Sequence, residues 1–240
     1  MKRYIGCSGY YYNHWKKLFY PENLPKGRWL EYYSDYFSTV EINNTFYRMP
    51  DKKSIRNWYS VTPKSFIFSI KGFRFFTHLK KLNIDSNFID QLNQFQDTIS
   101  FFKEKTGPLL WQFPRNFNAN PEKLDRFCSL LSASFSHVFE FRNLSWYNSE
   151  IFSILENHKH DLCMVSGPMT IPDVQKKFSS ITYIRFHGEG VWYNDNYSNE
   201  ALKAWKDKLS KTNTRNLFAY FNNDVNAYAV HNAKYFATLS

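Results

Sequence analysis

Ionisable side chains stand at the ends of several short β-branched or aromatic runs in this chain, where they could transfer protons or hold an anion. Glutamate and histidine can act as general acids or bases, and a desolvated lysine can act as a base or an amine nucleophile. We therefore predict Glu41, Lys71, Glu140 and His187 as catalytic residues. Two alternatives stay open: the glutamates only form buried ion pairs with nearby cations, and Lys71 is a charged anchor, which we favour for that residue.

Other polar and aromatic residues at or near the same ends are suited to hold a substrate. Arginine binds phosphate or carboxylate, and aromatic rings stack on a sugar or a nucleobase. The predicted binding residues are Ser8, Tyr10, Asn43, Tyr47, His78, Gln112, Arg142, Trp146, Arg185, Asn222 and Asn223. Packing under long loops is the alternative for the aromatic residues, and we favour it for Trp15 and Trp146.

Glutamate and histidine are also acceptable metal ligands, but here their spacing matches no compact metal motif. The nearby lysine and arginine side chains would moreover repel a divalent ion. We therefore predict no metal and no cofactor.

A sheet must bring these run ends together. Residues i and i+2 of a strand share a face, so Glu41 with Asn43, and Arg185 with His187, point the same way. The runs predict strands at 3–8, 39–43, 66–71, 109–113, 138–141, 162–165, 182–187 and 217–222. Helical spacing and capping residues predict helices at 28–37, 51–61, 86–105, 120–131, 149–157, 198–209 and 226–239. The sixth connection, which contains Pro168 and Pro172, has the weakest pattern.

Strands that alternate with helices predict a parallel sheet, because each return needs a helix-length connection. The first turn, Gly6-Cys7-Ser8-Gly9, lacks the spacing of a dinucleotide fingerprint, which disfavours an open doubly wound sheet. The length of 240 residues is close to the ~250 of a typical barrel. We therefore predict an α/β fold with one domain over residues 1–240, a (β/α)8 TIM-type barrel with outer helices.

Active sites of such barrels lie at the carboxyl ends of the strands, where the predicted site residues fall. Two late turns add a predicted anion site there. Gly188-Glu189-Gly190 allows a sharp turn after the seventh strand, and Asn222-Asn223-Asp224 precedes the last predicted helix, whose N-terminus attracts anions. The alternative for Asn223 or Asp224 is a simple helix cap.

The composition favours an anionic partner. Lysine and arginine number 31 against 21 acidic residues, a net charge of +10, which raises the local concentration of phosphates or nucleic acid. The chain has no apolar stretch of membrane-spanning length, and Met1-Lys2-Arg3 leads into the first strand without a signal peptide. Its three cysteines are widely separated and fit reduced thiols. We therefore expect a cytoplasmic protein without a membrane partner.

Several ordered motifs resemble a known family. They are Gly6-Cys7-Ser8-Gly9-Tyr10 with Trp15, the run TVEINNTFY at 39–47, Lys71 with Thr77-His78, WQFP at 111–114, Glu140-Phe141-Arg142 with Ser145-Trp146, YIRFHG at 183–188 and YFNND at 220–224. Together they are similar to the domain of unknown function family 72, the YecE-like proteins, over nearly the whole chain. The resemblance implies a TIM barrel and no reaction. Cys7 and Tyr10 depart from the threonine and tryptophan common there, which leaves the expected fold unchanged.

Two functions from different classes fit these residues. The first is an enzyme that acts on a small anionic substrate, phosphorylated or carbohydrate-like, by acid–base chemistry in a closed pocket. The second is a nucleic-acid-binding or nucleic-acid-processing protein with a basic, aromatic-lined barrel mouth and an open groove. A scaffold without catalysis is a third, in which the charged groups pair for stability only.

Overall fold

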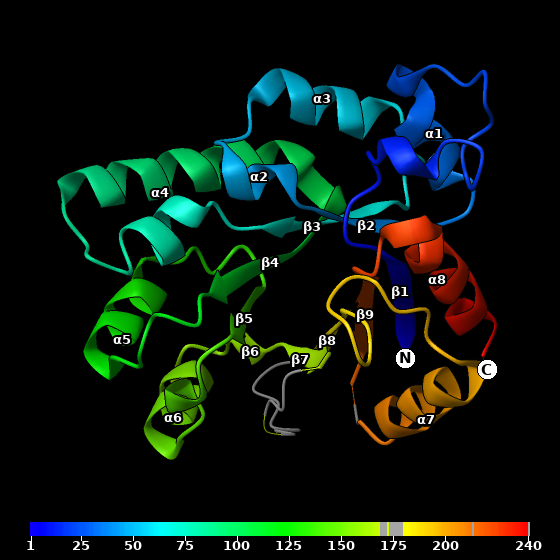
Figure 1. Cartoon of the computed structure of the whole chain (residues 1–240). Coiled ribbons are helices and arrows are strands. Elements are labelled where there is room, and N and C mark those ends of the chain that lie inside the picture. The colour runs from blue at the N-terminus through cyan, green and yellow to red at the C-terminus, as the bar shows by residue number, and fades with distance from the viewer. Residues whose placement is uncertain (169–171, 173–179, 213, 240) are drawn as a thin grey trace.

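The computed structural model describes residues 1–168, 172, 180–212 and 214–239, and parallel strands form its centre (Figure 1). One sheet has the strand order β1-β9-β8-β7, and the other has the order β2-β3-β4-β5-β6. The strands are β1 (Lys2–Cys7), β2 (Thr39–Ile42), β3 (Ile67–Lys71), β4 (Thr106–Phe113), β5 (His137–Phe141), β6 (Asp161–Leu162), β7 (Met164–Ser166), β8 (Ile181–Phe186) and β9 (Asn216–Phe221).

The two sheets meet at two places. An isolated parallel bridge between Ser8 and Glu41 joins the end of β1 to β2. On the other side, the single strand expected at 162–165 is split at Cys163, whose amide still donates to Phe139 O at 2.8 Å, so that β6 pairs with β5 and β7 pairs with β8. Within the described residues neither sheet closes on itself, so the structure establishes parallel strands in two sheets, which is coarser than the expected closed barrel.

Helices lie around the strands (Figure 1). The α-helices are α1 (Trp29–Ser34), α2 (Asn44–Tyr47), α3 (Lys52–Ser60), α4 (Ser86–Ile99), α5 (Pro121–Leu130), α6 (Ser149–Asn157), α7 (Asn199–Ser210) and α8 (Tyr228–Thr238). The shorter turns are η1 (Asn13–Trp15), η2 (Lys26–Arg28), η3 (Phe75–Leu79, a π-helix), η4 (Ser100–Lys105), η5 (Leu144–Trp146) and η6 (Val225–Ala227).

Side-chain caps explain where several helices begin. The expected caps are confirmed: Asp51 accepts from Ser54 N, and Asn120 accepts from Lys123 N with Pro121 in the first turn. The helix expected at 86–105 is α4 up to Ile99 and the 3-10 turn η4 beyond it, and within η4 the backbone of Lys103 leaves the helical region with φ 51°. The helix expected at 28–37 is a 3-10 turn followed by the shorter α1, and most of the sixth connection lies outside the described residues.

Alternation along the strands separates two hydrophobic cores. The larger one lies between strands and helices, where Ile184 and Phe186 of β8 pack with residues such as Phe236 of α8. The smaller one, inside the strands, consists of Tyr4, Leu110, Val138, Cys163, Ile181, Tyr183, Phe218 and Tyr220. The ionisable residues at the carboxyl ends lie above this inner core. None of the helices in the described part of the chain is long and apolar enough to cross a bilayer.

Candidate functional site

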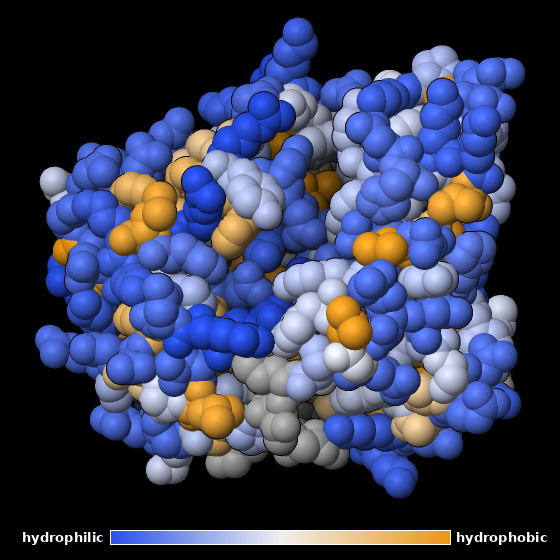
Figure 2. Space-filling view, in the orientation of Figure 1, coloured by the Kyte–Doolittle hydropathy of each residue, from blue (hydrophilic) through white to orange (hydrophobic). Residues whose placement is uncertain are grey.

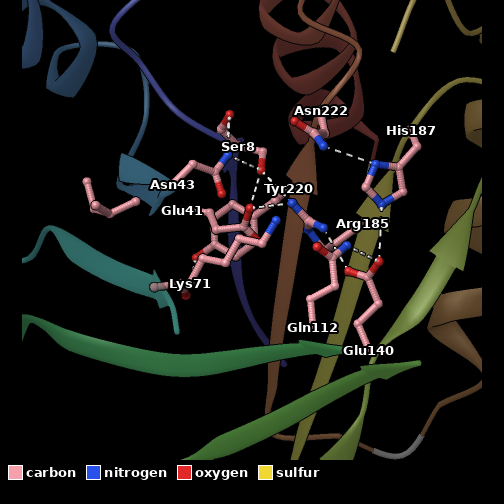
Figure 3. Close-up of polar contacts among 12 residues, drawn as sticks. Ser8, Glu41, Asn43, Lys71, Gln112, Glu140, Arg185, His187, Tyr220 and Asn222 are labelled. Carbon is pink, nitrogen blue, oxygen red and sulfur yellow. Dashed lines mark hydrogen bonds and ion pairs between the residues drawn. The ribbon is translucent and has the colours of Figure 1, made fainter. Parts of the chain in front are cut away.

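A buried guanidinium organises the site. Arg185 of β8 is 1% exposed and lies between two carboxylates, with its Nη1 donating to Glu140 Oε2 at 2.7 Å and its Nη2 donating to Glu41 Oε2 at 2.8 Å (Figure 3). Nη2 also donates to Ser8 Oγ at 3.0 Å. Burial alone would lower the pKa of Arg185, but Glu41 and Glu140 outweigh it and raise that pKa. Arg185 therefore remains charged and fixed.

Glu41 is completely buried and fully engaged. Its Oε1 accepts from the Tyr183 hydroxyl at 2.7 Å, and its Oε2 accepts from Ser8 Oγ as well as from Arg185. Asn43 supports Ser8 from the same side, with its Nδ2 donating to Ser8 Oγ at 2.9 Å. The carboxylate has no free face toward a substrate.

Glu140 is equally occupied. Its Oε1 accepts from Arg142 Nε and from Gln112 Nε2, the latter at 2.9 Å, while Oε2 accepts from Arg185. Burial opposes its charge, but Arg142 and then Arg185 outweigh burial and hold the pKa of Glu140 well below its ordinary value. Gln112 and Glu140 face each other because β4 and β5 place them in register. This geometry agrees with the alternative stated for the glutamates, that they form buried ion pairs with nearby cations.

His187 is neutral and has a defined tautomer. Its Nε2 lies 3.1 Å from Arg142 Nη2, and because arginine can only donate, Nε2 accepts. The ring proton is then on Nδ1, which faces Asn222 Nδ2 at 3.0 Å, and exchanging the oxygen and nitrogen of the Asn222 amide makes this contact a hydrogen bond donated by Nδ1. Burial first and the Arg185 charge second lower the pKa of His187 well below its ordinary value.

Lys71 differs from these residues because its ammonium is unpaired. In the described part of the chain its Nζ has no hydrogen bond or ion pair, and it lies 4.1 Å from the centre of the Phe46 ring. Figure 3 shows it beside the Arg185 cluster. Burial and then the Arg185 charge lower the pKa of Lys71 to about 7, although Glu140 and Glu41 act in the opposite direction.

A cavity of about 850 Å³ opens over these groups. Figure 2 shows a hollow near the middle of this face, bordered mainly by hydrophilic residues. Its cations are Arg48, Lys71 and Arg185, its amides include Asn43 and Asn222, and aromatic rings form much of the wall. The lining residues are Gly9, Tyr10, Tyr11, Tyr12, Ile42, Asn43, Asn44, Tyr47, Arg48, Ser54, Trp58, Lys71, Arg185, Tyr193 and Asn222. None of these residues is acidic, so the cavity suits an anion.

The structure also places the other predicted binding residues. Tyr10 and Tyr47 line the cavity. Trp146 is fully buried and donates to Phe117 O at 2.7 Å, so it anchors a loop, as favoured for it. Asn223 is also fully buried and donates to Asp195 O and Asn232 Oδ1, which places it under the loop after β8.

His78 lies beside the site and not in the cavity wall. Its Nδ1 is 2.9 Å from Thr77 Oγ1, and its ring meets the Phe46 ring edge-on at 4.8 Å. Burial, and Lys71 after it, lower the pKa of His78 to about 4, so it is neutral at pH 7.

Sequence reasoning missed several contributors. The sequence places Tyr183 in a strand without a role in the site. It stands two positions before Arg185 in that strand, and this spacing indicates that both side chains point to the same interior. Arg48 and Trp58 line the cavity, and Trp192 packs 4.6 Å from the Arg142 guanidinium. No sequence pattern identified Arg48 or Trp58, because they come from a loop and a helix around the strand ends, whereas Trp192 belongs to the aromatic residues that the sequence places in strand-end loops.

The cations and aromatic rings of the cavity do not identify a reaction. Similarity to known proteins identifies the family. The family described as protein of unknown function DUF72 matches residues 4–240. The UPF0759 protein YunF of Bacillus subtilis (strain 168) is 25% identical over 262 residues, covering 96% of this chain and 92% of that protein.

Two solved structures have the same fold. The DUF72 family protein TM1631 of Thermotoga maritima MSB8 superposes with a TM-score of 0.89 at 27% identity, covering 100% of this chain and 99% of that one. The DUF72 family protein EF0366 of Enterococcus faecalis V583 gives a TM-score of 0.81 at 18% identity, covering 98% and 94% of the two chains. The family match spans nearly the entire sequence, and the resemblance noted in the motifs is confirmed. The chain belongs to the DUF72 family.

Proposed function

We propose that this protein is an enzyme that binds a small anionic substrate, phosphorylated or carbohydrate-like, in the cavity at the carboxyl ends of the strands. The carrying observation is the unpaired ammonium of Lys71 in the wall of a cavity whose lining, within the described residues, includes no acidic side chain. Arg48 and Arg185 add positive charge to the same wall, and Arg185 Nε is buried without a partner among the described residues. An anion bound in the cavity supplies the acceptor that the Lys71 ammonium lacks among the described residues.

The proposed chemistry is acid–base catalysis centred on Lys71. A group with a pKa near the working pH exchanges protons most effectively, and Lys71, at about 7, meets that condition. Glu41, Glu140 and His187 have their acceptor atoms engaged by neighbouring donors. We assign these three to positioning Arg185 and Arg142 and to setting the electrostatic field around Lys71.

Two further features belong to this proposal. The Ser8–Glu41 bridge on one side and the β6–β7 strand on the other support a closed eight-strand barrel, in which β6 and β7 count as one strand. The three cysteines are free and buried, which supports a reducing compartment such as the cytoplasm.

A ligand screen tests the proposal. Native protein is mixed with inorganic phosphate, sugar phosphates and the same sugars without phosphate, and the unfolding midpoint is measured. We expect phosphorylated compounds to raise the midpoint, and Lys71→Met to abolish the rise. Lys64→Met removes an equal charge just before β3, at the opposite end of that strand, and should leave the response intact. Equal responses in the native protein and Lys71→Met would refute the proposed site.

Nucleic acid is the second candidate, favoured by one observation. Tyr11, Tyr47 and Tyr193 line the cavity and are 57%, 65% and 40% exposed, so they are available for base stacking. Short oligonucleotides belong in the same screen, at low and high salt. Oligonucleotide binding that falls steeply with salt, together with no response to sugar phosphates, would favour this candidate over the first.

A further inference from the structure

Among the described residues, the ammonium of Lys71 has none of the hydrogen-bond or ion-pair partners that a buried lysine normally has. Both neighbouring carboxylates accept hydrogen bonds from other residues on both oxygens, Glu41 from Tyr183, Ser8 and Arg185, and Glu140 from Arg142, Gln112 and Arg185. The face of the Phe46 ring lies 4.1 Å from Nζ. A cation without a counter-ion in a partly desolvated site favours its neutral form.

Lys105 provides an internal comparison. It is 2% exposed, more buried than Lys71, yet its Nζ donates to Tyr59 O at 2.6 Å and to Thr62 O at 2.9 Å. Those contacts are typical of a structural lysine, whose ammonium donates hydrogen bonds to backbone carbonyl groups at the C-terminal end of a helix. Lys71 makes no such contact and points toward a cavity large enough for a metabolite.

Building on the proposed function, we propose that Lys71 Nζ is an amine nucleophile that forms an imine with an aldehyde or ketone group of the anionic substrate. The nitrogen lone pair bonds to the carbonyl carbon, the C=O π electrons pass to oxygen, and a proton moves from nitrogen to that oxygen. The C–O bond then breaks as the oxygen leaves as water with a second proton from solvent, while the nitrogen lone pair closes the C=N bond. The product is a protonated imine.

The charge of this product restricts the substrate class. A protonated imine would stand among Arg185, Arg142 and Arg48, where an additional positive charge is unfavourable. A phosphate or carboxylate on the same substrate offsets that charge and binds the arginine side chains. Aromatic side chains in the cavity wall, including Tyr10 and Trp58, provide apolar contacts for the rest of the substrate. The inferred substrate is therefore a small phosphorylated or carboxylated aldehyde or ketone.

Borohydride trapping tests the imine directly on the native protein. Pyridoxal 5′-phosphate serves as the anionic aldehyde probe and pyridoxal as the matched aldehyde without phosphate. After reduction, peptide mass spectrometry locates each modified lysine. We expect Lys71 to be labelled at least about tenfold faster than exposed lysines such as Lys64 at neutral pH, because a much larger fraction of its amine is unprotonated. Pyridoxal without phosphate should label Lys71 more slowly than pyridoxal 5′-phosphate does, because it keeps the advantage of the unprotonated amine but lacks the group that binds the arginine side chains.

The controls separate this inference from the proposed function. Lys71→Arg should lose the preferred label, Lys64→Arg should keep it, and circular dichroism verifies that both variants fold. Inorganic phosphate should protect Lys71 from labelling. If phosphate raises the unfolding midpoint through Lys71 but Lys71 is labelled no faster than Lys64, the imine is refuted and the anion site stands. If phosphate neither stabilises nor protects, and labelling is indiscriminate, both fail.

Discussion

Replacing Glu140 by glutamine should cost this protein a large part of its stability. Glu140 is completely buried and accepts from Arg142, Arg185 and Gln112, so the neutral side chain leaves two guanidinium groups near an amide nitrogen that can only donate. Breaking a buried ion pair by removing one partner costs about 3–5 kcal/mol. For a chain of this length, each kcal/mol lowers the melting temperature by about 2–4 °C, which gives a fall of roughly 6–20 °C.

Urea unfolding followed by circular dichroism and tryptophan fluorescence measures this loss. The midpoint should fall while the dependence on urea concentration stays unchanged, because the variant exposes the same surface on unfolding. Glu22→Gln is the matched control, since Glu22 pairs with Lys17 at 2.7 Å but both side chains are more than half exposed. That variant should be indistinguishable from native protein. If Glu140→Gln matched the control, our account of a tightly paired interior would be wrong.

Three further outcomes are expected. The folded state holds the pKa of Lys71 at about 7 against about 10.4 in an unfolded chain, so the unfolded chain binds more protons between these values and this residue makes stability rise with pH there. Lys71→Met should therefore be more stable than native protein at pH 7, with the gap closing toward pH 10 in urea titrations; a gap that widens instead would contradict the assignment. Asn222→Leu removes the partner of His187 Nδ1 and should cost about 1 kcal/mol in the same assay, whereas Asn222→Asp keeps an acceptor and should cost less. Lys105→Met breaks the contacts to Thr62 and should lower stability by about 2–3 kcal/mol while phosphate binding is retained; loss of binding would show that the site depends on distant packing.

The sequence predicted the strands well because their side-chain parity is a local property. The inward face was predicted directly from two i, i+2 pairs, Glu41 with Asn43 and Arg185 with His187. The structure brings these residues into one site. The local pattern could not predict the break at Cys163, because it depends on pairing with Phe139 on one side and with β8 on the other. The closed form of the barrel was predicted from element order, which does not fix how the sheets meet.

Site roles were less accessible to sequence reasoning. Arg185 and Glu41 are 144 positions apart, so the sequence could list them as candidates but could not show that each satisfies the other. Trp146 is different, because the sequence already favoured a loop anchor for it and the structure adds its partner, the carbonyl oxygen of Phe117. Lys71 became the strongest reactive candidate once the structure showed which neighbours were already occupied.

Arg185 has a consequence for how mutants of this protein must be interpreted. Its guanidinium comes from the sheet containing β1 and β8 and holds Glu41 and Glu140 of the other sheet. Assembly of the Arg185 cluster and docking of the two sheets are thus one physical event, and amide exchange there should require global opening. Inactive clones from a random library will often be poorly folded clones, so protein abundance needs to be measured beside every assay of activity.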